Sequence, residues 1–428
     1  MELIVFFGSF LILLVMRCPV AFSMVLASFG FLLLNGQISL LIIPERMTIS
    51  LDSFPLLAVP FFVVAGVLMN RAGIARRIFD FALSIFGRFR AGLAHVNVIA
   101  SMIFAGMSGS AFADAAGLGA VEIKAMVEEG YDRDFSAAVT AASSCIGPVI
   151  PPSVVMVLYG VMAEVSIGEL FAAGMIPGII MGLSMMVLIY VLATMGKVNA
   201  PRGVKQPLRI VVQKTRAAFF PLLGPVFILG VILLGIATPT EAGVVATVYA
   251  LVLGLAYRTL SWKSLSEALE ESVLTTGRFM FIIAAASVFG WLVTIEQVAL
   301  VLYQSIQLIT TQKWIILLFV NIILLCLGCF IEGIAIMIVS IPALIPLMKA
   351  IQVDLVHFGV ILTISIMIGL ITPPVGMTLY IVSDIAKVRI EDVVRRVIPF
   401  LIPLVFTLFL TTYWDKMVLL IPKLLFRH

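Results

Sequence analysis

Charged residues are scarce in this chain of 428 residues, and long apolar runs take their place. Asp, Glu, Lys and Arg make up 12% of the sequence, whereas 62% belongs to the set AVILMFWYC. A soluble domain has about 25% charged and about 45–50% apolar residues. This composition excludes a disordered chain, a collagen-like repeat and a nucleic-acid-binding protein. We therefore expect an integral membrane protein, with room for on the order of ten to fourteen segments of about 20 residues.

Cysteine and histidine are also rare, with four and three copies respectively. The cysteines lie in or beside apolar runs, and only Cys326 and Cys329 have the C-x-x-C spacing. No second pair and no nearby histidine completes a zinc site. We expect these cysteines to be helix-packing residues, and we predict no cofactor or enzymatic metal.

The apolar runs and the basic residues between them predict the topology. Ten runs are typical of spanning helices: 3–16, 20–35, 51–69, 134–163, 168–196, 217–237, 243–257, 272–295, 357–385 and 397–414. Alternating sides then divide the 27 Lys and Arg residues into 21 on one side and 6 on the other. The rich side is cytoplasmic by the positive-inside rule, so both termini are predicted outside. The first run lacks a basic leader and a small-residue cleavage site, which indicates a retained helix.

A sequence repeat relates the two halves of the chain. The segment Ile146–Pro152 (IGPVIPP) aligns with Ile368–Pro374 (IGLITPP) at an offset of 222. The predicted topology sends the first copy outward and the second inward, which makes the repeats inverted. Inverted repeats are typical of secondary transporters, whose sites lie at mid-membrane between the copies.

The paired prolines predict an interruption in each of these helices. Proline removes an amide donor and clashes with the preceding turn, so each helix should unwind near mid-membrane. The freed carbonyls suit a cation, and the N-terminus of the resumed helix suits an anion. A purely structural kink is the alternative, because neighbouring helices can satisfy the freed groups.

Two further runs have the pattern of re-entrant hairpins. Hairpin 1, residues 91–130, has the polar centre Gly106–Asp114 (GMSGSAFAD), and hairpin 2, residues 314–350, has Glu332-Gly333 in an apolar stretch. Each would enter and leave the membrane on one side, with its tip at depth. The stretch 71–90 fits an amphipathic arm at the cytoplasmic interface, and 197–216 fits a cytoplasmic linker.

At these residues the chain resembles the large membrane subunit of the tripartite ATP-independent periplasmic (TRAP) transporters. The resemblance rests on four motifs in order: GMSGSAFAD at 106–114, SSCIGPVIPPS at 143–153, TPTEAG at 238–243 and GLITPPVG at 369–376. It implies an all-α, elevator-type sodium symporter for a small organic acid. The implied partners are a separate small four-helix membrane subunit and a periplasmic substrate-binding protein in a bacterial or archaeal inner membrane.

The same resemblance implies the residues of the site. One sodium site would combine the first tip with the first break, and the other would combine the second tip with the second break. The sodium residues are Ser108, Gly109, Ser144, Gly147, Pro148, Gly333, Gly369, Thr372 and Pro373. The substrate residues between the tips are Ser110, Asp114, Ser153, Glu332 and Thr372.

Three acidic residues carry their own alternatives. Acids inside a membrane are functional candidates, so Asp114 has an electrostatic role near the site or caps the second arm of hairpin 1. We expect Glu332 to be paired, protonated or bound to a cation. For Glu241, near the outer end of a span, capping or a salt bridge to a scaffold arginine competes with a gating role.

These expectations divide the chain into seven regions. They are scaffold and arm helices at 1–90, the first transport half at 91–165, a closing helix at 166–196, the linker at 197–216, scaffold helices and an outer arm helix at 217–312, the second transport half at 313–386, and a final helix and tail at 387–428.

Other functions remain open at this stage. Gly106–Gly109 (GMSG) matches the G-x-S-G of intramembrane serine proteases, with Ser108 as nucleophile, but none of the three histidines has a suitable position. A binding-protein-independent anion symporter or a channel is a further alternative. We expect a transporter rather than an enzyme.

Overall fold

The described elements are all helical, as the sequence predicts. The computed structural model describes residues 2–201, 206–298, 300, 304 and 310–426. In these ranges the chain forms helices joined by short turns, with no strand. The outer arm helix predicted before residue 312 falls mainly on positions outside these ranges.

One group of helices, here called the scaffold, comes from the two segments that precede the predicted repeats. Helix α4 packs along α13 and α14, α2 and α3 pack on α14, and α12 packs on α5 and α13. The scaffold consists of α1 (Glu2–Val15), α2 (Val20–Asn35), α3 (Ile42–Leu51), the 3₁₀ turn η1 (Phe54–Leu57), α4 (Ala58–Arg71), α5 (Ile74–Phe86), α12 (Leu208–Leu233), α13 (Pro239–Ala256) and α14 (Trp262–Ile295).

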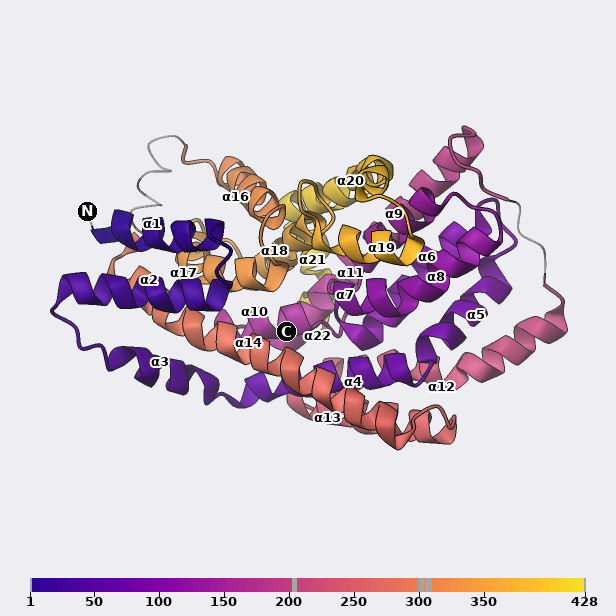
Figure 1. Ribbon diagram of the computed structural model, residues 1–428, viewed down its shortest axis with the longest axis horizontal. Helices are drawn as coiled ribbons and strands as arrows, with labels where there is room; N and C mark the ends of the chain where they lie inside the picture. Colours follow the sequence, from indigo (N-terminus) through magenta and orange to yellow (C-terminus); the bar gives the residue numbers. More distant parts are fainter. Residues whose placement is uncertain (1, 202–205, 299, 301–303, 305–309, 427–428) are drawn as a thin grey trace.

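The second group, here called the transport unit, contains both repeats. Its first half consists of α6 (Gly92–Ser108), α7 (Ala111–Ala113), the π-helical turn η2 (Asp114–Leu118), α8 (Gly119–Glu128), α9 (Arg133–Ser144), α10 (Val154–Met162) and α11 (Ile167–Thr194). Its second half consists of α16 (Lys313–Gly328), α17 (Gly333–Ala350), α18 (Leu355–Gly369), α19 (Met377–Ala386), α20 (Ile390–Tyr413), α21 (Asp415–Val418) and α22 (Leu420–Leu425). In Figure 1 the two hairpins lie toward opposite ends of the elongated molecule.

Helix length identifies candidate spanning helices, and these include α17, the second arm of hairpin 2. Seven helices in the described ranges are long and apolar enough to cross a membrane: Phe54–Arg71, Ile167–Thr194, Leu208–Leu233, Pro239–Ala256, Trp262–Ile295, Gly333–Ala350 and Ile390–Tyr413. Helix α6 has 17 residues and α9 has 12, so at about 1.5 Å per residue neither spans the roughly 30 Å of bilayer hydrocarbon. Helices α6 and α16 end at the two hairpin tips, and α9 and α18 end at the two double prolines, where the sequence predicts interruptions.

The predicted amphipathic arm is present as α5. Its buried side includes Ile74, Ile78 and Phe79, and Arg76 lies on the exposed side. Asp80 forms an ion pair of 2.7 Å with Lys214, near the start of α12. Because α12 begins at Leu208, half of the range predicted as linker is helical. The arm therefore joins the first turns of α12 on the side rich in basic residues.

Candidate functional site

The tip of hairpin 1 lies directly against the first helix break. Gly109 ends α6 in the left-handed conformation, with φ +56. A Cβ atom on Gly109 would lie 2.7 Å from the Pro152 carbonyl oxygen and 3.2 Å from the Ser153 Cα atom. Only glycine fits both this φ and this space. The structure thus brings together the tip and the break that the sequence assigned to the first sodium site.

Two serines in this first junction begin helices. The Ser110 hydroxyl accepts the backbone N–H of Ala113 at 3.4 Å, and the Ser153 hydroxyl accepts that of Met156 at 3.2 Å. A capping serine keeps its hydroxyl proton free to donate elsewhere. A Cβ atom on Gly147 would lie 3.7 Å from the Ser110 carbonyl oxygen, so both serines border the same break. Two helix N-termini therefore meet there, which favours an anion.

The second junction is built from two glycines in contact. A Cβ atom on Gly369 would lie 2.5 Å from the Gly328 Cα atom and 2.8 Å from its carbonyl carbon. Nearby, the Val375 N–H of the break donates to the Cys329 carbonyl at 3.3 Å. Gly333 packs on α18, where a Cβ atom on the glycine would lie 3.5 Å from the Met367 Cε atom. Hairpin 2 is thereby held on the end of α18.

Thr372 and Ser144 offer oxygen atoms rather than hydroxyl protons. The Thr372 hydroxyl donates to the Ile368 carbonyl at 2.7 Å, and the Ser144 hydroxyl donates to the Ala141 carbonyl at 2.8 Å. Their remaining lone pairs suit a hard cation better than a carboxylate. For Thr372 this geometry favours the predicted sodium role over the predicted substrate role.

Backbone carbonyl oxygens are the main atoms that could coordinate a cation at both junctions. Pro148, Pro151 and Pro152 in the first break, and Pro373 and Pro374 in the second, have no N–H to donate. No cluster of three or more His, Cys, Asp or Glu occurs in the described ranges. A cation bound at either junction would therefore be held by carbonyl and hydroxyl oxygens.

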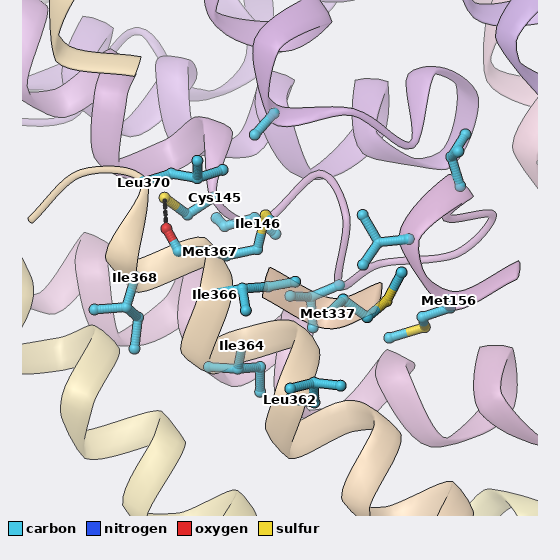
Figure 2. Packing of buried hydrophobic residues seen from close by; sticks show 14 of the residues in the cluster. Cys145, Ile146, Met156, Met337, Leu362, Ile364, Ile366, Met367, Ile368 and Leu370 are labelled. Carbon is cyan, nitrogen blue, oxygen red and sulfur yellow. Dashed lines mark hydrogen bonds between the residues drawn. The ribbon is translucent and has the colours of Figure 1, made fainter. Parts of the chain in front are cut away.

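The two repeats meet at residues that are equivalent in sequence. The Cys145 thiol donates to the Met367 carbonyl at 3.2 Å, and these positions are separated by 222 residues, the offset of the repeat (Figure 2). Around them, Ile146, Ile366 and Leu370 are buried. This contact marks the approximate two-fold axis between the halves.

Each resumed half-helix crosses to the opposite hairpin. Helix α10, which follows the first break, packs on α17 of hairpin 2, and Figure 2 shows Met156 and Met337 in this region. Helix α19, which follows the second break, packs on α7, η2 and α8 of hairpin 1. The two junctions therefore share one core.

The three acidic candidates have different surroundings. Glu332 is half-buried at the start of α17, where its side chain makes no cap hydrogen bond. The Arg278 side chain of the scaffold helix α14 interacts electrostatically with Glu332. Asp114 is 1% exposed inside the second arm of hairpin 1, and Ser110, not Asp114, provides the side-chain cap.

Glu241 has the capping role that the sequence left open. It accepts the Thr238 backbone N–H and the Thr238 hydroxyl at 2.8 Å each, while the Thr238 hydroxyl accepts the Glu241 N–H at 3.3 Å. This reciprocal capping box begins α13 after Thr238. The side chain is thus occupied at a helix start.

The protease alternative finds no base in the described ranges. The His357 ring contacts the Thr411 carbonyl at 2.6 Å, and His95 is buried near the start of α6, about four turns from Ser108. The Ser108 side chain and His428 lie outside the described part of the molecule.

Sequence reasoning missed several residues of this region. Gly328, Cys145 and Glu122 were not predicted to take part. Gly328 could have been found, because a glycine near the end of the first hairpin arm, like Gly106 in hairpin 1, allows close packing at a tip. The position of Glu122 depends on the π turn η2, which the sequence does not signal.

Comparisons with known proteins agree with this architecture. Residues 7–417 match the family described as tripartite ATP-independent periplasmic transporter, DctM component. The sialic acid TRAP transporter large permease protein SiaM of Vibrio cholerae is 42% identical over 408 residues, with 95% of each chain covered. The C4-dicarboxylate TRAP transporter large permease protein DctM of Pseudomonas aeruginosa is 38% identical, with 87% of each covered.

A more distant structural likeness concerns the fold alone. The chain superposes on the YdaH transporter of Alcanivorax borkumensis with a TM-score of 0.62 at 13% identity, covering 86% of this chain and 87% of that one. The sequence relatives and the seven long apolar helices together indicate a multi-pass inner-membrane permease. This chain belongs to the DctM family of TRAP transporter large permease proteins.

Proposed function

We propose that this permease takes up a small organic acid by sodium-coupled symport, after delivery by a periplasmic binding protein. The observation that carries the proposal is the pair of equivalent junctions, each with a hairpin tip seated on a proline break. Each junction combines oxygen donors for a cation, and the first also has two helix N-termini for an anion. The relatives' names include sialic acid, C4-dicarboxylates and 2,3-diketo-L-gulonate, which are all carboxylates.

The proposed partners are a small membrane subunit and the binding protein. The match to a tripartite family supports them. The basic-residue asymmetry supports a membrane orientation with both termini outside. An impermeant reagent applied to intact cells should label a tag at either terminus, and labelling only after lysis would contradict this orientation.

The proposed motion is an elevator, in which the transport unit slides against the scaffold. The distribution of polar contacts supports it. Arg71 of α4 pairs with Glu267 and Glu271 of α14 at 2.7 and 3.0 Å, entirely within the scaffold. Arg396 of α20 pairs with Asp134 of α9 at 2.8 Å, entirely within the transport unit. Apart from Asn35, Glu169 and Asp354, the long-range hydrogen bonds and ion pairs of the described ranges follow the same division.

The close contacts across the boundary between the two groups include small and apolar residues. Gly106 lies against Pro225 of α12, where a Cβ added to the glycine would be 2.7 Å from the Pro225 Cβ atom. Gly290 of α14 lies against Pro342 of α17, where an added Cβ would be 2.6 Å from the Pro342 Cγ atom. Phe62 and Phe171 meet across it with ring centroids 6.4 Å apart. Sliding such a surface breaks few hydrogen bonds, each of which would cost about 0.5–1.5 kcal/mol.

The test is uptake into proteoliposomes that contain this chain, its small subunit and the binding protein. An inward sodium gradient should drive uptake of an organic acid, and an equal potassium gradient should not. Ser110→Ala should raise the substrate concentration for half-maximal uptake about tenfold or more, since a hydrogen bond to a charged group contributes about 1.5–3 kcal/mol. Ser184→Ala is the matched control, because Ser184 bonds only the Met181 carbonyl of its own helix. Uptake that ignores the cation, or that needs no binding protein, would favour the channel or simple symporter alternative.

A further inference from the structure

Two acidic side chains lie buried on the second arm of hairpin 1. Asp114 is 1% exposed and Glu122 is 0% exposed. The Asp114 Oδ1 atom and both Glu122 carboxylate oxygens have no hydrogen-bond partner. Neither residue belongs to an ion pair found in the described ranges. A buried, unpaired carboxylate costs several kcal/mol, so the two cannot both be left as bare anions.

The π turn between them brings these carboxyls to one face of the arm. In a regular α-helix, residues eight apart differ by about 80° around the axis. The turn η2 (Asp114–Leu118) takes up about one residue more than an α turn, so the pair is related like residues seven apart, about 20° from alignment. Helical side chains lean toward the N-terminus, so Glu122 leans toward Asp114 from about two turns further along the arm, while Asp114 leans toward Ser110. The two carboxyls are electrostatic neighbours.

The polar residues beside the pair provide a shared donor for Asp114 and none for Glu122. Asn97 donates to the Thr140 hydroxyl at 2.7 Å, and the Ser143 hydroxyl donates to the Asn97 Oδ1 atom at 2.7 Å. The Ser101 hydroxyl in turn donates to the Ser143 hydroxyl at 3.1 Å. The Ser101 hydroxyl is also hydrogen-bonded to the Asp114 carboxyl, so its single proton is shared between that carboxyl and Ser143, and its oxygen can still accept. A protonated carboxyl could donate to that oxygen, whereas a carboxylate could not.

The charged groups on the helices packed against this arm (α4, α5, α6, α9 and α19) do not neutralise the pair. Those with partners elsewhere are Arg71 with Glu267 and Glu271, Arg77 over Tyr257, Asp80 with Lys214, Asp134 with Arg396, and Asp384 with Lys387. Those on the exposed surface are Arg76, Arg133 and Tyr380. His95 of α6 is buried about 200° around its helix from Asn97, on another face. Cys145, after α9, is an electrostatic neighbour of Asp114 but brings no positive charge.

We propose that Asp114 and Glu122 form a proton-binding pair inside hairpin 1, which holds at least one proton while the arm is packed between α6, α9 and α19. The proton neutralises one carboxyl and so removes the repulsion between the two buried groups. Packing of hairpin 1 is then linked to proton binding, and the transport cycle becomes sensitive to pH.

The first test measures folding stability and does not depend on transport. An exposed carboxyl in an unfolded chain is ionised at neutral pH, so folding around the pair takes up a proton. For each such proton, the folding equilibrium constant should fall about tenfold per unit of rising pH, starting above the pKa of an exposed carboxyl, about 4, and continuing until the folded protein also loses the proton. Glutamine mimics the neutral acid. In thermal unfolding of the purified complex, Glu122→Gln should therefore lower the pH dependence of the folding equilibrium constant by one factor of ten per pH unit.

The matched control is Glu128→Gln on the same helix, because the Glu128 side chain is 65% exposed. It should leave the pH dependence of unfolding as in the wild type. Equal pH dependence in the wild type and Glu122→Gln would overturn the proposal. If Glu122→Gln does not fold, infrared spectroscopy of the wild type decides instead, since the pair predicts a carbonyl band of a protonated carboxyl at neutral pH that Asp114→Asn alters. Absence of that band would also overturn it.

A second test extends to transport and rests on the proposed function. Under a fixed sodium gradient, the uptake rate of the wild type should vary with pH, and Glu122→Gln should flatten that profile more than Glu128→Gln. If no protein takes up substrate, the sodium-symport proposal fails while the stability measurement still decides the proton site. If uptake is sodium-driven and both variants keep the wild-type pH profile, the proton pair has no role in transport.

Discussion

Replacing Gly369 by alanine tests whether the second junction depends on direct backbone contact. Its new methyl group would lie 2.5 Å from the Gly328 Cα atom, 2.8 Å from the carbonyl carbon and 3.1 Å from the carbonyl oxygen. A carbon–carbon contact is comfortable only near about 3.5–4.0 Å, so hairpin 2 and α18 must separate by roughly 1 Å. All three obstructing atoms belong to the backbone, and no side-chain rotation can relieve the clash.

The expected cost of this separation is about 1–3 kcal/mol, as for other overpacked positions in a well-filled core. Function should suffer more, because a binding site loses its geometry when its parts shift by more than about 0.5 Å. We expect Gly369→Ala to unfold at lower temperature and to need at least tenfold more sodium for half-maximal uptake. Gly328→Ala should behave alike, since its methyl group would lie 2.7 Å from the Gly369 Cα atom.

The control is Gly230→Ala in the last turn of α12, a position where a Cβ would meet no atom within 4 Å. It should be neutral or slightly stabilising, because alanine is the better helix former by about 1 kcal/mol. Thermal unfolding of the purified complex and sodium titration of uptake measure the two effects separately. Wild-type stability and wild-type sodium dependence in Gly369→Ala would refute the reasoning.

Two other changes test the charges of the side rich in basic residues and of the boundary. Arg396→Gln removes the contact with Asp134 that ties α20 to α9, and because both side chains are partly exposed we expect a loss of only about 1 kcal/mol or less in unfolding measurements. Arg389→Gln, whose partner is on its own helix, should lose less, and the reverse order would contradict the assignment. Arg278→Gln removes the scaffold charge near Glu332, so uptake should change severalfold and Arg278→Lys should restore it, whereas identical rates in all three proteins would show that this charge is irrelevant.

The interruptions of the fold were predictable because they are local. Proline and glycine act on the turn in which they occur, so the breaks after Ser144 and Gly369 and the tip at Gly109 could be located from the sequence. The capping box of Glu241 was likewise foreseeable as one of its alternatives, since Thr238 precedes it by three residues. These features need no knowledge of what packs against them.

The tertiary contacts could not be predicted in the same way. Apolar runs without strong periodicity do not say which helix faces which, so the crossing of α10 and α19 to opposite hairpins was missed. Glu122 shows the limit most clearly. On a regular helix it would point about 80° away from Asp114, and the extra residue absorbed in η2 brings the two to one face.

The crossed packing has a consequence for how the two junctions can act. Because α10 rests on hairpin 2 and α19 rests on hairpin 1, a shift at either tip presses on the half-helix that leaves the other break. The Cys145–Met367 contact joins the two at their centre, where the surrounding side chains are fully buried and leave little room for independent movement. A cation at one junction should therefore stabilise the other junction as well, and the polar contacts confined within the transport unit favour its movement as one body.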